Sequence, residues 1–191
     1  MPDILKSIDQ GLFFFLNGLH SPFFDLVMFY GTMTVLWSPL YLVLLCLVIR
    51  KYRLRSLWVL LFAVIMIIVS DQLSGIVKEW VARPRPTHEP ALSGIHTVNG
   101  YLGGQFGFYS AHASTNMAIA LFMIIILGRP FRYFPEMIIA WALFMAYTRI
   151  YLGVHYPGDI IAGWFAGAFI GWCAGSLCIR FLIPGRKKSP E

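Results

Sequence analysis

The sequence predicts an all-α polytopic membrane protein, a bundle of about five to six transmembrane helices preceded by an N-terminal interfacial amphipathic helix. Three observations support this fold class. The 191 residues are 58% hydrophobic and only 13% charged, which is too apolar for a soluble domain of this length. The apolar residues form runs near the roughly 20 residues that a helix needs to cross a bilayer. Stretches that contain Pro and Gly separate these runs, and such stretches punctuate helices.

We predict five spans within a single membrane-embedded domain, residues 1–191. They are expected at Leu26–Ile49, Leu57–Val77, Ala113–Leu127, Met137–Leu152 and Ile160–Ile183. Residues 1–22 lack the basic start and long apolar region of a signal peptide, so we interpret them as a helix lying in the membrane interface. Residues 184–191 are a polar tail, expected in the cytoplasm.

Lysines and arginines near the span ends predict the orientation of the chain in an inner or plasma membrane. Alternation of the spans places most of them on one side, which is therefore expected to be cytoplasmic: Arg50, Lys51, Arg53, Arg55, Arg129, Arg132, Arg186, Lys187 and Lys188. These loops account for most of the net charge of +6, so the charge does not indicate nucleic acid as a partner. The basic residues on the opposite face break the charge rule and need another reason to be there.

Three polar clusters are expected on that opposite, extracytoplasmic face: KEWVARPRP, YSAHAS and TRIYLGVHYPGD. They supply fixed cations, two imidazoles, a hydroxyl and a carboxylate. A hydrolase of phosphate esters needs such groups, because it must bind charged phosphoryl oxygens, attack phosphorus, protonate a leaving group and orient the nucleophile. The residues concerned are Lys78, Arg85, Ser110, His112, Arg149, His155 and Asp159.

Each of these residues also has a purely structural interpretation. The cations, and Arg83 beside them, could be anchors that extend to lipid headgroups. His112 could pack or cap, and Ser110 could be the N-cap of the third span. Asp159 could favour the first turn of a helix that begins at Pro157. These interpretations do not explain why such residues gather on the face that should be poor in positive charge.

The spacing of the clusters resembles the three-part signature of the type 2 phosphatidic acid phosphatases, a membrane group related to vanadium-dependent haloperoxidases. The signature here is Lys78-x6-Arg85-Pro86, then Ser110-x-His112, then Arg149-x5-His155-x3-Asp159.

Two departures from the family pattern stand out. Tyr109-Ser110-Ala111-His112 replaces the usual Pro-Ser-Gly-His, and Thr148 replaces the serine that usually precedes the arginine. Alanine in place of glycine keeps the backbone N–H donors but narrows the accessible backbone angles. Neither departure removes a reacting group, so we expect activity.

The resemblance implies a phosphohistidine mechanism without a metal or cofactor. His155 would be the nucleophile, Asp159 would hold its ring, and His112 would protonate the leaving oxygen and then activate water. The phosphoryl oxygens would be bound by Lys78, Arg85, Ser110, Arg149 and backbone N–H groups at the start of the third span, including that of Ala111. No carboxylate cluster suited to Mg²⁺ accompanies these motifs.

Two functional classes remain open. The first is a lipid phosphatase, for which we rank undecaprenyl diphosphate as substrate before lipid A, with phosphatidylglycerol phosphate and phosphatidate as further candidates. The second is a transporter or lipid-binding scaffold, but a transporter usually places its polar groups near the membrane midplane. The expected partners are the lipid substrate and the bilayer, and no obligate protein partner is evident.

Four further polar residues have no assigned chemistry. Asp71 is expected to be a structural partner of Lys78 or Arg149. Asn116 could support His112 or link two helices. His88 and His96 are expected as solvated loop histidines, since no further ligands accompany them for zinc.

Overall fold

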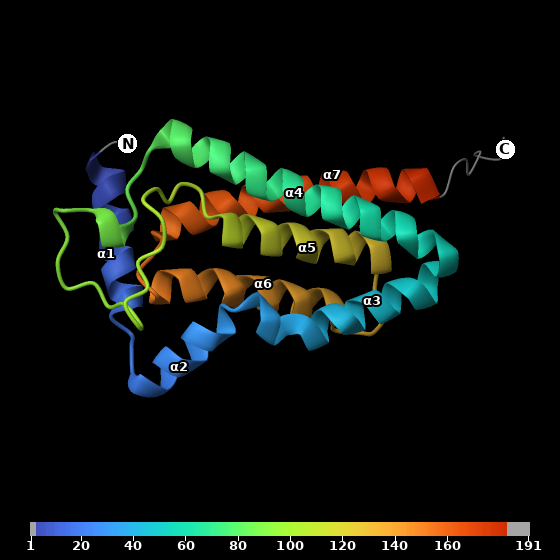
Figure 1. The fold of residues 1–191 in the computed structure, drawn as a ribbon, viewed down its shortest axis with the longest axis horizontal. Coiled ribbons are helices and arrows are strands. Elements are labelled where there is room, and N and C mark those ends of the chain that lie inside the picture. Colours follow the sequence, from blue (N-terminus) through green and yellow to red (C-terminus); the bar gives the residue numbers. More distant parts are fainter. Residues whose placement is uncertain (1–2, 183–191) are drawn as a thin grey trace.

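The structure is a computed structural model that describes residues 3–182. Within this range the chain is helical except for its turns and loops, with one isolated bridge between Pro84 and Phe106. Figure 1 shows α3 to α7 along the long axis and α1 across one end. The helices are α1 Asp3–Asn17, α2 Pro22–Gly31, α3 Ser38–Tyr52, α4 Ser56–Val81, α5 Ala111–Leu127, α6 Phe134–Tyr151 and α7 Pro157–Leu182, with 3-10 turns at Thr34–Trp37, Arg53–Arg55 and Pro86–His88.

The last four predicted spans are confirmed as helices α4 to α7, and the N-terminal helix is confirmed as α1. The first predicted span is wrong, because the apolar run Leu26–Ile49 divides between α2 and α3. Gly31 ends α2 against the ring of Phe144, where an added Cβ would lie 2.9 Å from the ring. The indole of Trp37 donates to the freed Gly31 carbonyl at 2.8 Å. The predicted tail at 184–191 lies outside the described residues.

Small residues bring α5 and α7 into backbone contact. An added Cβ on Gly167 or Gly171 would overlap the carbonyl oxygen of Ser114 or Ala118 on α5, and one on Gly163 would lie 2.7 Å from the Ser110 carbonyl. Four-residue spacing places these glycines on one face of α7, the arrangement that allows close packing of membrane helices. The first turns of α5 and α7 are therefore held side by side.

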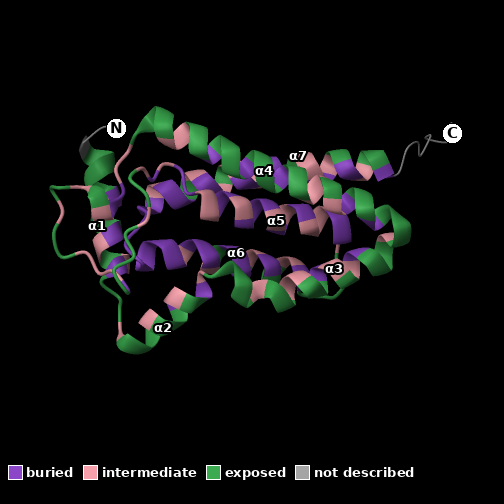
Figure 2. Ribbon diagram, in the orientation of Figure 1, coloured by how far each residue is buried: buried purple, intermediate pink, exposed green. Residues whose placement is uncertain are grey.

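The outer faces of the bundle are apolar, as in an integral membrane protein. Figure 2 shows exposed residues along α3 and α4 and many buried ones on α5 and α6. By length and composition, Thr34–Val81, which includes α3 and α4, and Pro157–Leu182 can cross a membrane. The bent pair Ile4–Asn17 and Pro22–Gly31 would add a third crossing if counted as one, and Ala111–Leu127 is apolar but shorter.

Basic residues close the end of the bundle that lies far from α1. The ammonium of Lys51 donates to the carbonyls of Ile126 and Leu127 at 2.8 and 3.0 Å. Arg55 donates to the Leu182 carbonyl at 3.0 Å. These carbonyls end α5 and α7 and lack partners inside their own helices, so cations there satisfy them and complement the helix dipoles.

Helix α1 is amphipathic with its polar positions turned toward the protein. Asp9 and Asn17 are buried together with Phe13. The opposite side exposes apolar side chains, namely Ile4, Leu5, Ile8, Leu12 and Phe15. An exposed apolar face on a helix lying across the end of a membrane bundle fits the interfacial position predicted from the sequence.

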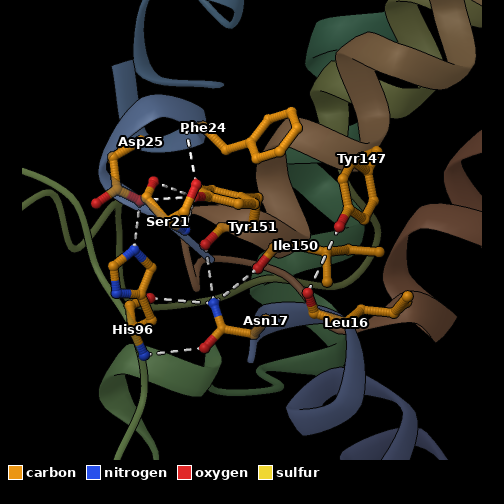
Figure 3. A network of polar contacts seen from close by, with 9 residues as sticks. All are labelled: Leu16, Asn17, Ser21, Phe24, Asp25, His96, Tyr147, Ile150 and Tyr151. Carbon is orange, nitrogen blue, oxygen red and sulfur yellow. Dashed lines mark hydrogen bonds and ion pairs between the residues drawn. The ribbon is translucent and has the colours of Figure 1, made fainter. Parts of the chain in front are cut away.

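Asn17 fixes the long loop between α4 and α5 (Figure 3). Its side-chain amide donates to the His96, Ile150 and Tyr151 carbonyls at 3.0, 3.2 and 2.8 Å, and its oxygen accepts from the His96 N–H at 2.9 Å. The His96 ring contacts Asp25 at 2.8 Å. The expectation of a solvated His96 is therefore wrong, since this side chain helps to attach the loop to α2.

Candidate active site

The three sequence clusters meet at the end of the bundle that α1 crosses (Figure 1). They come from the last turn of α4 and the loop after it, the first turn of α5, and the turn between α6 and α7. The backbone N–H of Ser110 donates to the Asp159 carbonyl at 3.1 Å, which joins the second cluster to the third. Lys78 is half-buried on the last turn of α4 at the same end.

His155 and Asp159 form the buried pair that the motif spacing suggests. The ring Nδ1 lies 3.3 Å from Asp159 Oδ2, which also accepts from the backbone N–H of Tyr156 at 3.1 Å. Because an ionised carboxylate only accepts hydrogen bonds, Nδ1 carries the proton and Nε2 keeps its lone pair. Burial lowers the pKa of His155 to about 4, against the opposing effect of Asp159. The imidazole is thus neutral at neutral pH, the form that can attack.

Two buried guanidinium groups keep free donors at this end. Arg85 donates through Nε to the Phe106 carbonyl at 3.0 Å, and Arg149 donates to Thr32 and Tyr101 at 3.0 and 2.9 Å. Among the described residues, Arg85 Nη1 and Arg149 Nε have no hydrogen-bond partner although both atoms are buried. Buried donors are costly unless satisfied, so the pair fits an anion such as a phosphoryl group.

Glycines in the long loop allow this close approach. An added Cβ on Gly103, whose φ is +68°, would overlap Arg85 Nη1. One on Gly107 would lie 3.0 Å from Asp159 Oδ2 and 3.5 Å from His155 Nδ1. The sequence analysis missed both residues, because nothing in "YLGGQFG" indicates which side chains the loop covers. The sequence feature that could have indicated Gly103 and Gly107 is the group of glycines just before the second motif.

The first turn of α5 supplies the second motif. Ser110 is its N-cap residue, and the hydroxyl accepts from the Ala113 N–H at 3.4 Å. The N-cap interpretation of Ser110 is therefore confirmed. Ala111 begins the helix, and the ring of His112 contacts the Thr32 carbonyl at 3.3 Å through Nε2. The free N–H groups and dipole of this helix start favour an anion.

A cavity of about 700 Å³ extends from His112 between α3, α4 and α5. Polar groups surround its His112 end, among them Gln72, Thr115 and Asn116. Asp71 also lines this end and forms no ion pair with a described residue, so its expected pairing with Lys78 or Arg149 is not seen. The remaining walls are mostly apolar: Leu44, Leu45, Val48, Leu60, Ala63, Met66, Ile67, Ile68, Ile119, Phe122 and Met123.

The sequence analysis did not decide the role of Arg83, and the structure shows its contacts. Its guanidinium pairs with Asp159 Oδ1 at 2.8 Å and with Asp9 Oδ2 at 2.6 Å. Arg83 therefore points into the site instead of anchoring the chain to headgroups. Asp9 was not singled out at all, because its partners lie more than 70 residues away in sequence.

Fold and site together define a membrane-embedded phosphatase. The chain belongs to the PAP2 superfamily, which it matches over residues 56–182. It is a lipid phosphatase of this family, and the alternative of a transporter or scaffold is not supported. The family resemblance drawn from the motif spacing is thus confirmed.

Comparison with known proteins gives relatives of named activity. The chain is 35% identical to a lipid A 4'-phosphatase of Bacteroides thetaiotaomicron, covering 90% of this chain and 77% of the relative. It is 30% identical to a lipid A 4'-phosphatase of Porphyromonas gingivalis, covering 88% and 72%.

Solved structures share the fold. A transmembrane PAP2 type phosphatidylglycerolphosphate phosphatase from Bacillus subtilis aligns with a TM-score of 0.66 at 20% identity, covering 93% of this chain and 86% of that one. LpxE of Aquifex aeolicus aligns with a TM-score of 0.63 at 23% identity, covering 90% and 94%.

The unsatisfied donors lead to a prediction about vanadate, which can adopt the geometry of phosphorus under attack. Replacing Arg85 with Gln should weaken vanadate binding roughly 10- to 100-fold, because a hydrogen bond to a charged group contributes about 1.5–3 kcal/mol. Calorimetry on purified protein in detergent measures the affinity. Arg129→Gln, at the far end of the bundle, is the matched control and should bind like the wild type. Equal affinity in both variants would exclude Arg85 from the anion site.

Proposed function

We propose that the protein removes the phosphate from a lipid A-type glycolipid through a phosphohistidine intermediate. Two relatives that match most of this chain are named lipid A 4'-phosphatases. The similarity to an undecaprenyl-diphosphatase of Sulfolobus acidocaldarius covers 31 residues, 16% of this chain. We therefore place lipid A before undecaprenyl diphosphate and reverse the order that the sequence alone favours.

The observation that supports a lipid substrate most strongly is the cavity beside His112. It follows α5 from His112 to Met123, a rise of roughly 16 Å at 1.5 Å per residue. Its walls are apolar away from the His112 end, so an acyl chain can lie along them while the phosphate reaches the cations. Ile67 and Ile68, which are partly exposed, open the cavity to the surface of the bundle.

In the first chemical step, His155 Nε2 attacks phosphorus opposite the leaving oxygen. The bond from phosphorus to that oxygen breaks as the bond to Nε2 forms. His112, protonated once the phosphate anion is bound beside it, gives the oxygen a proton and becomes neutral. Negative charge on the phosphoryl oxygens is balanced by Lys78, Arg85 and Arg149 and by the start of α5. Asp159 stabilises the positive charge that develops on the His155 ring.

In the second step, water attacks the phosphohistidine. His112, now neutral, accepts a proton from the water, and the bond from phosphorus to Nε2 breaks. Inorganic phosphate leaves and His155 returns to its neutral form. Burial lowers the pKa of His155 to about 4, and a weakly basic imidazole leaves phosphorus more readily.

We also propose that the site faces away from the cytoplasm. Its end of the bundle lies opposite the basic turn around Arg53 and the loop at Arg129, which the positive-inside rule assigns to the cytoplasm. An outward-facing site suits a substrate of the cell envelope.

The substrate proposal predicts an order of rates. Lipid A carrying only a 4'-phosphate should release phosphate at least about 10-fold faster than undecaprenyl diphosphate, phosphatidylglycerol phosphate or phosphatidate, a difference within reach of pocket contacts. Phosphate release by purified protein in detergent measures it. His155→Ala is the control for contaminating activity. A faster rate on undecaprenyl diphosphate than on lipid A would contradict the proposed substrate and favour undecaprenyl diphosphate.

The two histidines should respond differently to the leaving group. His155→Ala removes the nucleophile and should abolish turnover on every substrate. His112→Ala should lower the rate of phosphate release from an alkyl phosphate by about 10²–10⁴-fold, the usual contribution of general acid catalysis. It should lower the rate on nitrophenyl phosphate much less, because that leaving group needs little protonation. Rates on both substrates measure the difference. Equal losses for His112→Ala would show that it is not the acid.

Orientation can be tested by labelling. In a chain whose native cysteines Cys46, Cys173 and Cys178 are changed to serine, Ser93→Cys in the exposed long loop should react with an impermeant thiol reagent in intact cells. Arg129→Cys, exposed at the opposite end, should react only after lysis. The reverse pattern would place the site in the cytoplasm.

A further inference from the structure

A chain of charged contacts connects α1 to the candidate nucleophile. Asp9 on α1 pairs with Arg83 at 2.6 Å, and Arg83 pairs with Asp159 Oδ1 at 2.8 Å. The other oxygen of Asp159 contacts His155 Nδ1 at 3.3 Å. The side chains are only 8%, 16% and 0% exposed for Asp9, Arg83 and Asp159, so solvent screens these charges weakly.

The same face of α1 holds the backbone that carries His155 and Asp159. Asp9 Oδ1 accepts from the Gly158 N–H at 2.7 Å, in the first turn of α7. An added Cβ on Gly158 would lie 2.9 Å from Asp9 Oδ2, so a larger residue would displace the Asp9 carboxylate from this position. Tyr156 lies between the ring of Phe13, with centroids 5.5 Å apart, and the guanidinium of Arg83, 4.1 Å above its ring.

We propose that Asp9 and Arg83 are positioning residues for phosphoryl transfer. Arg83 fixes the Asp159 carboxylate that orients His155. Asp9 balances the positive charge of Arg83, so that Asp159 still stabilises positive charge on the His155 ring. This inference rests on the proposed role of His155 as nucleophile. It assigns α1 a part in catalysis that lies outside the three motifs.

The balance of charge explains why both residues are needed. A buried Arg83 alone would draw electron density from Asp159 and weaken its support for a positive His155 ring. The carboxylate of Asp9 offsets that charge, so Asp159 acts on His155 nearly as an unpaired carboxylate would. Arg83 meanwhile occupies Asp159 Oδ1, which leaves Oδ2 for Nδ1 and fixes the direction of the hydrogen bond.

The two residues should therefore shift the titration of His155 in opposite directions. The charged groups around the ring are Asp159 from α7, Arg149 from α6, and Arg85 from the loop after α4, with Arg83 and Asp9 behind Asp159. Asp9→Asn leaves Arg83 unbalanced and should move the titration to lower pH. Arg83→Gln leaves two carboxylates and should move it to higher pH. Each shift should be about half a unit to one unit, since charges one contact removed act less than direct partners.

The experiment compares four proteins by NMR: wild type, Asp9→Asn, Arg83→Gln and the double variant. Ring signals of His155, assigned by their absence in His155→Ala, are followed against pH in detergent. The expected order of titration is Asp9→Asn lowest, Arg83→Gln highest, and the double variant near wild type. Asp9→Asn keeps the size of the side chain and an acceptor for Gly158. Lys6→Gln, a charge change on the exposed face of α1, should leave the titration unchanged.

Activity of the same proteins on nitrophenyl phosphate is the second readout. Asp9→Asn should lower kcat about 10-fold, the scale on which carboxylates behind functional histidines act, and leave KM within about twofold because Asp9 touches no phosphoryl oxygen. The double variant should recover part of this loss. A contact that merely held α1 in place would make the double variant no better than the single ones.

The outcomes separate this inference from the proposed function. Identical His155 titrations in all four proteins would overturn the positioning proposal, as would equal loss of kcat in the single and double variants. The predicted order of titrations, found in a protein that releases no phosphate from the lipid panel, would support the charge coupling and reject the proposed substrates instead.

Discussion

The structure depends on one fully buried carboxylate, that of Asp159. One oxygen accepts from His155 and from the Tyr156 backbone, the other pairs with Arg83, and its backbone carbonyl accepts from Ser110. A buried charge without such partners would cost several kcal/mol. These partners come from the turn before α7, from the segment after α4 and from the start of α5, so satisfying Asp159 also brings these three parts of the chain together. The candidate catalytic pair, His155 and Asp159, and the fold of this end of the bundle therefore form by the same contacts.

A second constraint is the gathering of cations. Lys78, Arg85 and Arg149 repel one another, and two of the guanidinium groups retain buried donors without partners among the described residues. Such an arrangement is unfavourable until an anion enters, which is how a site can favour a phosphoryl group and its more highly charged transition state. Backbone contacts between α5 and α7, which Gly163, Gly167 and Gly171 allow, hold the start of α5 beside His155 and Asp159.

Much of this could be predicted from the sequence, for reasons specific to each element. Long apolar runs predict α4 to α7 because a bilayer imposes a length on a helix, and the spacing of His155 and Asp159 places them one turn apart. The break between α2 and α3 could not be predicted, since it depends on Phe144 packing on Gly31. The contacts made by Asp9, Arg83, Gly103 and Gly107 could not be predicted either, because they join segments that are distant in sequence. Local sequence pattern predicts the candidate reacting groups but not the residues that hold them in place.

The place of the site at the helix ends follows from the substrate. A phosphate is too costly to bring to the membrane midplane, and an acyl chain is too costly to bring into water. A largely apolar cavity that begins at His112 and runs into the bundle would meet both requirements. Helix α1 lies across the end of the bundle where the candidate site is, with Asp9 buried and its apolar side exposed. If α1 lies in the membrane interface as proposed, it also supports the turn that carries His155 through the contacts of Asp9 with Gly158 and Arg83. The same helix would then set the depth of the protein in the membrane and the alignment of the proposed nucleophile.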